Sequence, residues 1–230
     1  AAQLPAALAE LSESMSIGVT RLKTPRGGQD DAAEVLTLGS DLVVVDGYRF
    51  NTSYFETLRK GDSLHVVIDD NVETTAMSPF AIINQNPHAE PSMYRHLDTS
   101  PLLLLGLDYA LIRPAVVAAS SESSEKDAIA VFVSLGGSDP LGITVRLVER
   151  LSDAGIHTRV AVGTATYQRS AVIDRLERLP ATIVVDPARL PHELARSELA
   201  VVGAGTTMWE AAFLGVPAVG VVVADNQSNP

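Results

Sequence analysis

The sequence predicts an α/β protein made of two domains, each an open parallel sheet whose strands alternate with helices. Two observations support this fold class. Short apolar segments alternate with segments of helical spacing along the chain, and a polar, serine-rich stretch without aromatic residues interrupts that alternation at 115–127. A chain of 230 residues is long enough for two domains of ordinary size. We therefore expect an N-terminal domain over 1–114, a linker over 115–127 and a C-terminal domain over 128–230.

The first half of the chain begins with a helical pattern. Apolar residues at positions 4, 7, 8 and 11 lie on one face of a helix predicted over Leu4–Met15. Alternation favours a strand over Ile17–Leu22, and a proline with two glycines favours a loop over Lys23–Asp31. The remaining pattern predicts helices over Ala32–Leu38 and Thr52–Lys60, and strands over Leu42–Val45, His65–Ile68 and Ala81–Ile83.

Polar residues follow each of these last three strands, as Asp46-Gly47-Tyr48, Asp69-Asp70 and Asn84-Gln85-Asn86. The carboxyl ends of parallel strands meet at one edge of a sheet, so Asp46, Asp69, Asp70 and Asn84 are expected to line that edge together. Each residue alone is also explained as a turn former or a helix cap. Three strands that end alike favour a ligand site.

The second half has the same alternation. Predicted strands cover Ala130–Ser134, Thr158–Val162 and Thr182–Val185, and predicted helices cover Leu141–Ala154, Ser170–Leu179 and Pro191–Arg196. The half ends in Leu199–Gln227, which contains an apolar strand, a glycine turn, a short helix and a second apolar strand that begins at Ala218. Gly215 followed by Pro217 ends the helix before that strand.

Two glycine turns of the second half have the composition of anion sites. Ala204-Gly205-Thr206 stands at a helix start, where free amides and the helix dipole both favour phosphate. Phe132–Pro140 (FVSLGGSDP) runs from a strand through Gly136-Gly137 and Ser138 toward a helix. This stretch lacks the lysine of a P-loop and the GxGxxG spacing, so alone it also fits a plain tight turn. The two turns together predict a phosphate site.

Glu210 has two interpretations. Thr207-Met-Trp-Glu210 fits a capping box, in which the glutamate side chain reaches back to the amide of the cap residue. Alternatively, Glu210 accepts hydrogen bonds from ribose hydroxyls, one helical turn from the phosphate donors.

The composition is that of a soluble globular protein, with 46% hydrophobic and 20% charged residues. The net charge of −11 argues against nucleic acid or an anionic membrane as the partner, because both need a basic surface. An anionic ligand must then be held by backbone amides and a few arginines. The absence of cysteine excludes disulfides and thiolate chemistry. No apolar run approaches the roughly 20 residues of a membrane span, and Ala1–Glu10 is unlike a signal peptide, so we expect a cytoplasmic protein.

The five histidines, at positions 65, 88, 96, 157 and 192, have no metal-ligand spacing. His65 lies within a predicted strand and is expected to pack there. His88 and His96 lie in a loop after a strand, so they alone could reach a cleft and act as an acid or base. The alternative for both is a surface position.

Four segments of the chain together resemble one family. They are Leu42–Phe50 (LVVVDGYRF), Tyr109–Pro114 (YALIRP), Phe132–Pro140 and Leu199–Gln227 with its GAGTTMWE, LGVP and ADNQ runs. They are similar to the UDP-sugar hydrolases of pseudaminic acid biosynthesis, which cleave UDP-2,4-diacetamido-2,4,6-trideoxy-β-L-altropyranose, and to related spore-coat polysaccharide proteins. The wider resemblance is to glycosyltransferases of the GT-B fold, including the peptidoglycan enzyme that transfers N-acetylglucosamine. This resemblance implies two Rossmann-like domains that face each other across a cleft.

The resemblance also implies a UDP-sugar as the ligand and assigns residues to it. The implied nucleotide-binding residues are Gly136, Gly137, Ser138, Gly205, Thr206 and Thr207 around the diphosphate, and Glu210 on the ribose. The implied sugar-binding residues are Asp46, Tyr48, Asn84, Asp225, Asn226 and Gln227. The family's reaction is the attack of water on the anomeric carbon with release of UDP, and it requires no metal or cofactor.

The chain departs from the family's pattern in three ways. Family members open with a strand and a glycine-rich loop that carries the catalytic histidine, whereas Leu4–Met15 resembles their second helix, so the catalytic histidine is expected before Ala1. Gly142 stands where the family usually has asparagine, and the chain stops soon after ADNQ, without closing helices. Two alternatives stay open: a GT-B glycosyltransferase that passes the sugar to an acceptor, and a nucleotide-sugar-binding protein without catalysis.

Overall fold

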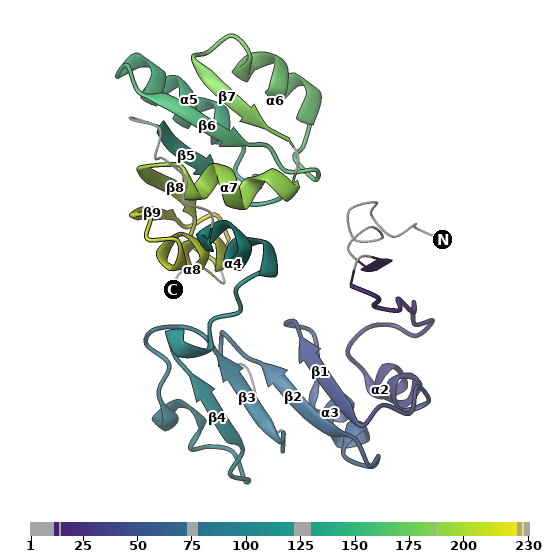
Figure 1. Ribbon diagram of the computed structural model, residues 1–230. Helices are drawn as coiled ribbons and strands as arrows, with labels where there is room; N and C mark the ends of the chain where they lie inside the picture. Colours follow the sequence, from purple (N-terminus) through teal and green to yellow (C-terminus); the bar gives the residue numbers. More distant parts are fainter. Residues whose placement is uncertain are drawn as a thin grey trace. The chain divides into compact units, whose positions relative to one another are not determined.

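The computed structural model describes residues 12–13, 15–72, 78–121, 130–185, 187–224 and 227 (Figure 1). The chain divides into two compact units, Ala1–Ala110 and Leu111–Pro230. This boundary lies a few residues before the domain boundary predicted at 114, so Arg113 belongs to the second unit. The helix predicted over Leu4–Met15 lies almost wholly outside the described residues.

The first unit contains a four-stranded parallel sheet in the order β1-β2-β3-β4. Its strands are β1 (Leu42–Asp46), β2 (Leu64–Ile68), β3 (Ala81–Asn84) and β4 (Leu102–Leu105). Its helical elements are α2 (Gln29–Leu36), α3 (Thr52–Leu58), η1 (Pro91–Tyr94) and η2 (Leu107–Tyr109). Helices α2 and α3 bury Ala32, Tyr54, Phe55 and Leu58 against Val45 and Val67 on one face of this sheet. Leu42, Val44, Leu64 and Leu102 are exposed on the other face.

One prediction for the first unit was wrong, and one strand of this unit was not predicted. Ile17–Leu22 forms no strand, because no described strand pairs with it, and an isolated extended segment has no ladder to stabilise it. The amides of Lys23 and Thr24, which follow it, instead donate to the carboxylate of Glu34 in α2. Strand β4 was not predicted either, because its four consecutive leucines lack the alternation that marks a half-buried strand.

The second unit contains a five-stranded parallel sheet in the order β7-β6-β5-β8-β9. Its strands are β5 (Ala130–Ser134), β6 (His157–Ala161), β7 (Ala181–Val184), β8 (Leu199–Gly203) and β9 (Ala218–Val221). Its helical elements are α4 (Pro114–Ser121), α5 (Thr144–Asp153), α6 (Arg169–Leu176), η3 (Pro187–Arg189), α7 (Leu190–Ala195) and α8 (Thr206–Phe213).

Both faces of this second sheet are covered. Val145, Val148 and Leu176 of α5 and α6 pack on one face, and Leu194 and Ala211 of α7 and α8 pack on the other. The chain adds strands outward from β5 to β7 and then returns to the other side of β5 for β8 and β9. The strand order therefore reverses between β5 and β8, which is the point where open α/β sheets bind ligands.

Helix α4 is a correction to the predicted linker. Residues 115–121 of that stretch are helical, and the rest of the linker up to 127 lies outside the described residues. Val116 and Ala119 are buried, and α4 packs against α7. The serines at the end of this segment made it look like a linker in composition. It is helical nevertheless, because apolar contact with another helix outweighs the weak helix propensity of serine.

Candidate functional site

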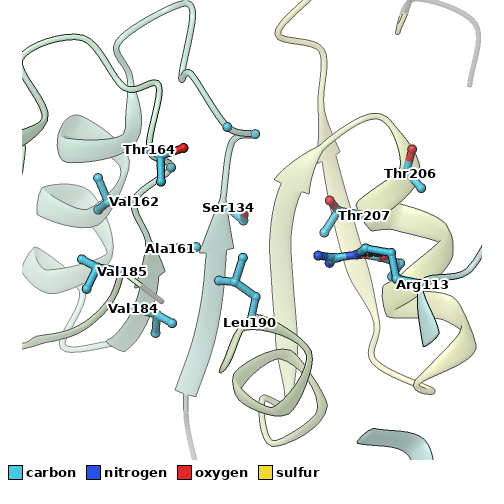
Figure 2. Close-up of a pocket in the computed structure, with 14 residues that line it drawn as sticks. Arg113, Ser134, Ala161, Val162, Thr164, Val184, Val185, Leu190, Thr206 and Thr207 are labelled. Atoms are coloured by element: carbon cyan, nitrogen blue, oxygen red, sulfur yellow. Dashed lines mark hydrogen bonds and ion pairs between the residues drawn. The ribbon is translucent and has the colours of Figure 1, made fainter. Parts of the chain in front are cut away.

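A cavity of about 430 Å³ opens at the carboxyl ends of the strands of the second unit (Figure 2). One part of its wall is polar and contains Arg113, Ser134, Gly136, Gly137, Thr206, Thr207 and Glu210. The other part is mostly apolar and contains Ala161, Val162, Val184, Val185 and Leu190, with Gly163 and the hydroxyl side chain of Thr164 beside Val162. The cavity is therefore divided by chemistry into a hydrogen-bonding end and an apolar end.

The polar end is built by the two loops that flank the reversal of strand order. Gly136 and Gly137 follow β5, and Gly205 precedes Thr206, the first residue of α8, after β8. The first amides of a helix have no intrahelical acceptor, and its N-terminus carries partial positive charge. Thr206 and Thr207 add hydroxyl groups on the same wall (Figure 2). This end has the donors that bind an anion.

The Gly136-Gly137 turn is held by the loop after β6. Gly136 has φ of +86°, a left-handed conformation that favours glycine. The amide of Ala165 donates to the carbonyl of Gly137 at 3.1 Å. A Cβ on Gly163 would lie 2.1 Å from that same carbonyl oxygen, so only glycine fits there. A Cβ on Gly137 itself would meet nothing within 4 Å, because it would point into open space.

Two predicted phosphate-site residues, Ser138 and Gly205, are not among the residues that line the cavity. Ser138 is exposed and is not part of the cavity wall as described. Gly205 is the N-cap of α8 and lies beside the side-chain amide of Gln227, whose Oε1 accepts from the amide of Val223 at 2.9 Å. Gly142 has φ of +61°, a conformation that asparagine also tolerates, so the departure from the family's pattern keeps the backbone geometry.

Glu210 is buried beneath the polar end and forms an ion pair with Arg113. The Arg113 Nε lies 2.5 Å from Oε1 of Glu210, and its Nη2 lies 2.8 Å from Oε2. The Glu210 side chain is 2% exposed and the Arg113 side chain is 49% exposed. The hydrogen bonds that Arg113 donates to Glu210 raise the pKa of the guanidinium despite partial burial, so Arg113 stays charged. Such a two-bond pair is stronger and more directional than a single contact.

This pair overturns the capping-box interpretation. Helix α8 begins at Thr206 with Gly205 as its N-cap, so Thr207 is not the cap residue, and no side chain caps the helix. The carboxylate of Glu210 is turned to Arg113 instead. Sequence reasoning missed Arg113 because it precedes Glu210 by 97 residues. The only available signal was its presence in the YALIRP segment.

The carboxyl edge of the first unit has a different arrangement. Three of its predicted residues come together, because Asp69, Asp70 and Asn84 share a hydrogen-bond network with Tyr48, Tyr94 and Asn86. The Nδ2 of Asn84 donates to the Tyr94 hydroxyl at 2.9 Å, and its Oδ1 accepts from the Asn86 amide at 3.1 Å. Burial raises the pKa of Tyr94 to about 12, so its phenol is neutral. Asn84 is 0% exposed, which gives it a structural role.

The other predicted residues of the first unit are more accessible. The Tyr48 hydroxyl donates to the Asp70 carboxylate at 2.8 Å, and the Asp46 side chain is exposed while its backbone carbonyl accepts from Arg26. His88 and His96 are exposed residues of the segment between β3 and β4. Asp225 and Asn226 lie outside the described residues.

Within the described ranges, no group of three histidine, aspartate or glutamate side chains is arranged to hold a metal ion. The same part of the chain contains no helix that is both long and apolar enough to span a bilayer.

Comparison with known proteins supports the fold and a distant relationship. No family model matches the chain. It is 28% identical over 118 residues to the spore coat polysaccharide biosynthesis protein SpsG of Bacillus subtilis, a match that covers 49% of this chain and 35% of that protein. It is also 20% identical over 202 residues to the uncharacterised protein MJ1062 of Methanocaldococcus jannaschii, covering 83% of this chain and 42% of the relative. The matches thus span less than half the length of both relatives.

Two solved structures share the fold. MurG of Acinetobacter baumannii superposes with a TM-score of 0.55 at 14% identity, over 96% of this chain and 69% of that one. A candidate UDP-N-acetylglucosamine 2-epimerase from Listeria monocytogenes superposes with a TM-score of 0.54 at 10% identity, over 95% of this chain and 70% of that one. The chain therefore has a GT-B-like α/β fold with two parallel sheets.

Proposed function

We propose that the second unit binds a UDP-sugar and that the protein hydrolyses it, releasing UDP in the biosynthesis of a pseudaminic-acid-type nonulosonate or a surface polysaccharide. The observation that carries the proposal is the cavity at the reversal of strand order, which joins anion donors to an apolar end. Its volume of about 430 Å³ falls within the range of small-molecule sites.

The cavity offers each part of a nucleoside diphosphate a chemically suitable wall. Val162, Val185 and Leu190 provide an apolar surface for the flat face of a base. Gly136, Gly137 and Thr206 provide close backbone approach and hydroxyl donors for the diphosphate. Glu210 provides carboxylate oxygens for the two ribose hydroxyls. In this proposal Asp46, Tyr48 and Gln227, together with Asp225 and Asn226, remain candidates for the hexose. Asn84 does not, because its side chain is bonded to the Tyr94 hydroxyl and the Asn86 amide.

The proposed reaction breaks one bond and forms one. A water oxygen attacks the anomeric carbon, the bond from that carbon to the β-phosphate oxygen breaks, and the electron pair leaves with UDP. The water loses one proton, and the products are UDP and the free sugar. The residues of the second unit bind the nucleotide and stabilise the charge of the leaving diphosphate. The base that activates the water is not assigned to a described residue.

The comparisons support this choice of pathway and substrate class. SpsG is by name a spore coat polysaccharide biosynthesis protein, and the epimerase is by name an enzyme of a UDP-sugar. Because the chain spans only part of these proteins, the hydrolytic activity is a proposal for the whole protein.

UDP binding is tested first by adding a single methyl group to the cavity wall. Gly137→Ala adds a methyl in open space at the cavity wall, so we expect an unchanged melting temperature and a fall in UDP affinity of at least about tenfold by calorimetry, which is about 1.4 kcal/mol. Gly18→Ala is the matched control, because its Cβ would also meet nothing and it lies in the first unit. A folded wild-type chain that does not bind UDP contradicts the proposal.

Catalysis is tested by incubating the protein with UDP-2,4-diacetamido-2,4,6-trideoxy-hexose and following products by NMR. Hydrolysis gives UDP and free sugar in equal amounts without any acceptor. Release of UDP only when an acceptor is present indicates a glycosyltransferase instead. Tight binding without release of UDP indicates a nucleotide-sugar-binding protein.

A further inference from the structure

Arg113 is the charged donor of the cavity in which we propose that a nucleoside diphosphate binds. Among the described residues of its wall, Arg113 is the only basic side chain, and the wall also contains the acidic Glu210. The protein as a whole carries a net charge of −11, so no general positive field attracts a diphosphate. Backbone amides and hydroxyls supply dipoles to this end, but a full positive charge comes from Arg113.

The ion pair leaves hydrogen-bonding capacity on both partners. A carboxylate has about four acceptor positions, and the two bonds from Arg113 use one on each oxygen of Glu210. Two positions therefore remain for a vicinal diol. A guanidinium has five N–H donors, and Glu210 takes one from Nε and one from Nη2. Within the described part of the chain, the structure records no protein acceptor for the Nη1 group of Arg113.

The orientation of Arg113 directs its remaining N–H donors toward the cavity. Nearly half of its side chain is exposed although Glu210 is buried. Figure 2 shows the guanidinium pointing into the cavity next to Thr207, at the polar end. Arg113 directly precedes α4, and its carbonyl accepts from the amides of Val116 and Val117, so the start of a packed helix holds its backbone in place.

We propose that Arg113 and Glu210 form one recognition unit for a nucleoside diphosphate, in which Arg113 orients Glu210 for the ribose diol and itself binds a phosphate oxygen through Nη1. The inference rests on the proposed function, and it adds a phosphate-binding residue and a coupling between the two parts of the ligand. The site then discriminates a nucleoside diphosphate from the nucleoside, because only the diphosphate engages both members of the pair. Lysine replaces Arg113 only in part, since a single ammonium keeps the charge but does not hold both carboxylate oxygens and a phosphate in one plane.

The test compares UDP with uridine in the wild-type chain and in Arg113→Gln, Glu210→Gln and the double variant. Arg113→Gln is expected to lower UDP affinity roughly 10- to 100-fold, because charge-assisted hydrogen bonds are lost, and to lower uridine affinity several-fold less. The double variant is expected to lose less UDP affinity than the product of the two single losses. In the wild type, salt weakens UDP binding more steeply than in Arg113→Gln.

Two further variants keep the test decisive. Arg113→Lys retains a cation beside the buried carboxylate, and we expect it to fold and to bind UDP with an affinity between those of wild type and Arg113→Gln. Arg175→Gln breaks the exposed pair with Glu149, whose N–O distance is also 2.8 Å, and is expected to change neither affinity.

The outcomes separate the inference from the function on which it rests. Equal losses for UDP and uridine in Arg113→Gln overturn the phosphate contact, and additive losses in the double variant overturn the coupling. Wild-type affinity for UDP in folded Arg113→Gln overturns the inference while the proposed function stands. A wild-type chain that binds no UDP overturns both.

Discussion

The two parallel sheets end on polar residues in one unit and on small residues in the other, and their carboxyl edges differ accordingly. In the first unit, polar groups at the strand ends bond to one another: Asn84 donates to the Tyr94 hydroxyl, which donates to the Asp69 carbonyl, and the Tyr48 hydroxyl donates to the Asp70 carboxylate. In the second unit, Gly136 and Gly137 after β5 and Gly205 after β8 leave room, and a cavity of about 430 Å³ lies there. Polar residues at strand ends can thus complete a fold without forming an open site, whereas glycines at the same topological position leave backbone donors accessible.

The buried polar groups of the two units show a related difference. The phenol of Tyr94 and the amide of Asn84 satisfy each other, and they need no exposed partner. Glu210 is as buried as these groups, but its partner Arg113 is half exposed and lines the cavity. A buried polar group whose partner reaches the surface is a more informative mark of a site than a polar group alone.

The largest expected effect on stability comes from the contact between the Gly136-Gly137 turn and the loop after β6 in the second unit. Gly163→Ala would place a methyl 2.1 Å from the Gly137 carbonyl oxygen, so the two turns must move apart. We expect a loss of at least about 3 kcal/mol in the free energy of unfolding, together with loss of UDP binding. Urea denaturation and calorimetry measure these two quantities. Wild-type stability in Gly163→Ala would show that the loops are not in contact.

A smaller effect tests the structural role of the first edge. Asn84→Ala removes two buried hydrogen bonds and leaves the Asn86 amide without its acceptor, so we expect a loss of about 2–4 kcal/mol. UDP affinity, which depends on the second unit, is expected to stay unchanged. Asp46→Ala at the same edge is the stability control, because its exposed side chain predicts a change within about 0.5 kcal/mol. Equal stability of the two variants would contradict the network.

The smallest effect compares two histidines that lie in strands of the two units. Burial lowers the pKa of His65 in β2 from its ordinary value of 6.5, and its Nε2 has no partner among the described residues. The unfolded chain therefore takes up a proton near pH 6.5 that the folded chain does not, and the stability that His65 contributes above pH 6.5 is lost as the pH falls below it.

Urea unfolding between pH 7.5 and about pH 5 measures this loss. We expect His65→Gln to reduce the pH dependence of the free energy of unfolding. His157 in β6 is the control, because it is exposed and contacts the Thr182 hydroxyl at 3.2 Å, so His157→Gln is expected to keep the wild-type dependence. The idea fails if His65→Gln follows the same pH profile as the wild type.

The local sequence pattern was sufficient to predict much of the fold. Strands such as β1, β2 and β5 are short apolar runs bounded by polar or glycine residues, and that pattern depends only on neighbours in sequence. The glycine turns at Gly136 and Gly205 were recognisable for the same reason, since backbone freedom is a property of the residue itself. Ile17–Leu22 has the pattern of a strand but no strand beside it, and α4 owes its position to contact with α7.

By itself, the sequence determined the alternating α/β class, the two glycine turns and the acidic charge that leaves an anionic ligand to local donors. Only the tertiary structure decided which side chains face one another. It turned Glu210 away from a helix cap and toward Arg113, and it buried Asn84 under Tyr94 instead of leaving it at an open edge. The physical reason is that backbone periodicity is set by residues a few positions apart, whereas the partner of a buried charge is set by packing between elements that are distant in the chain.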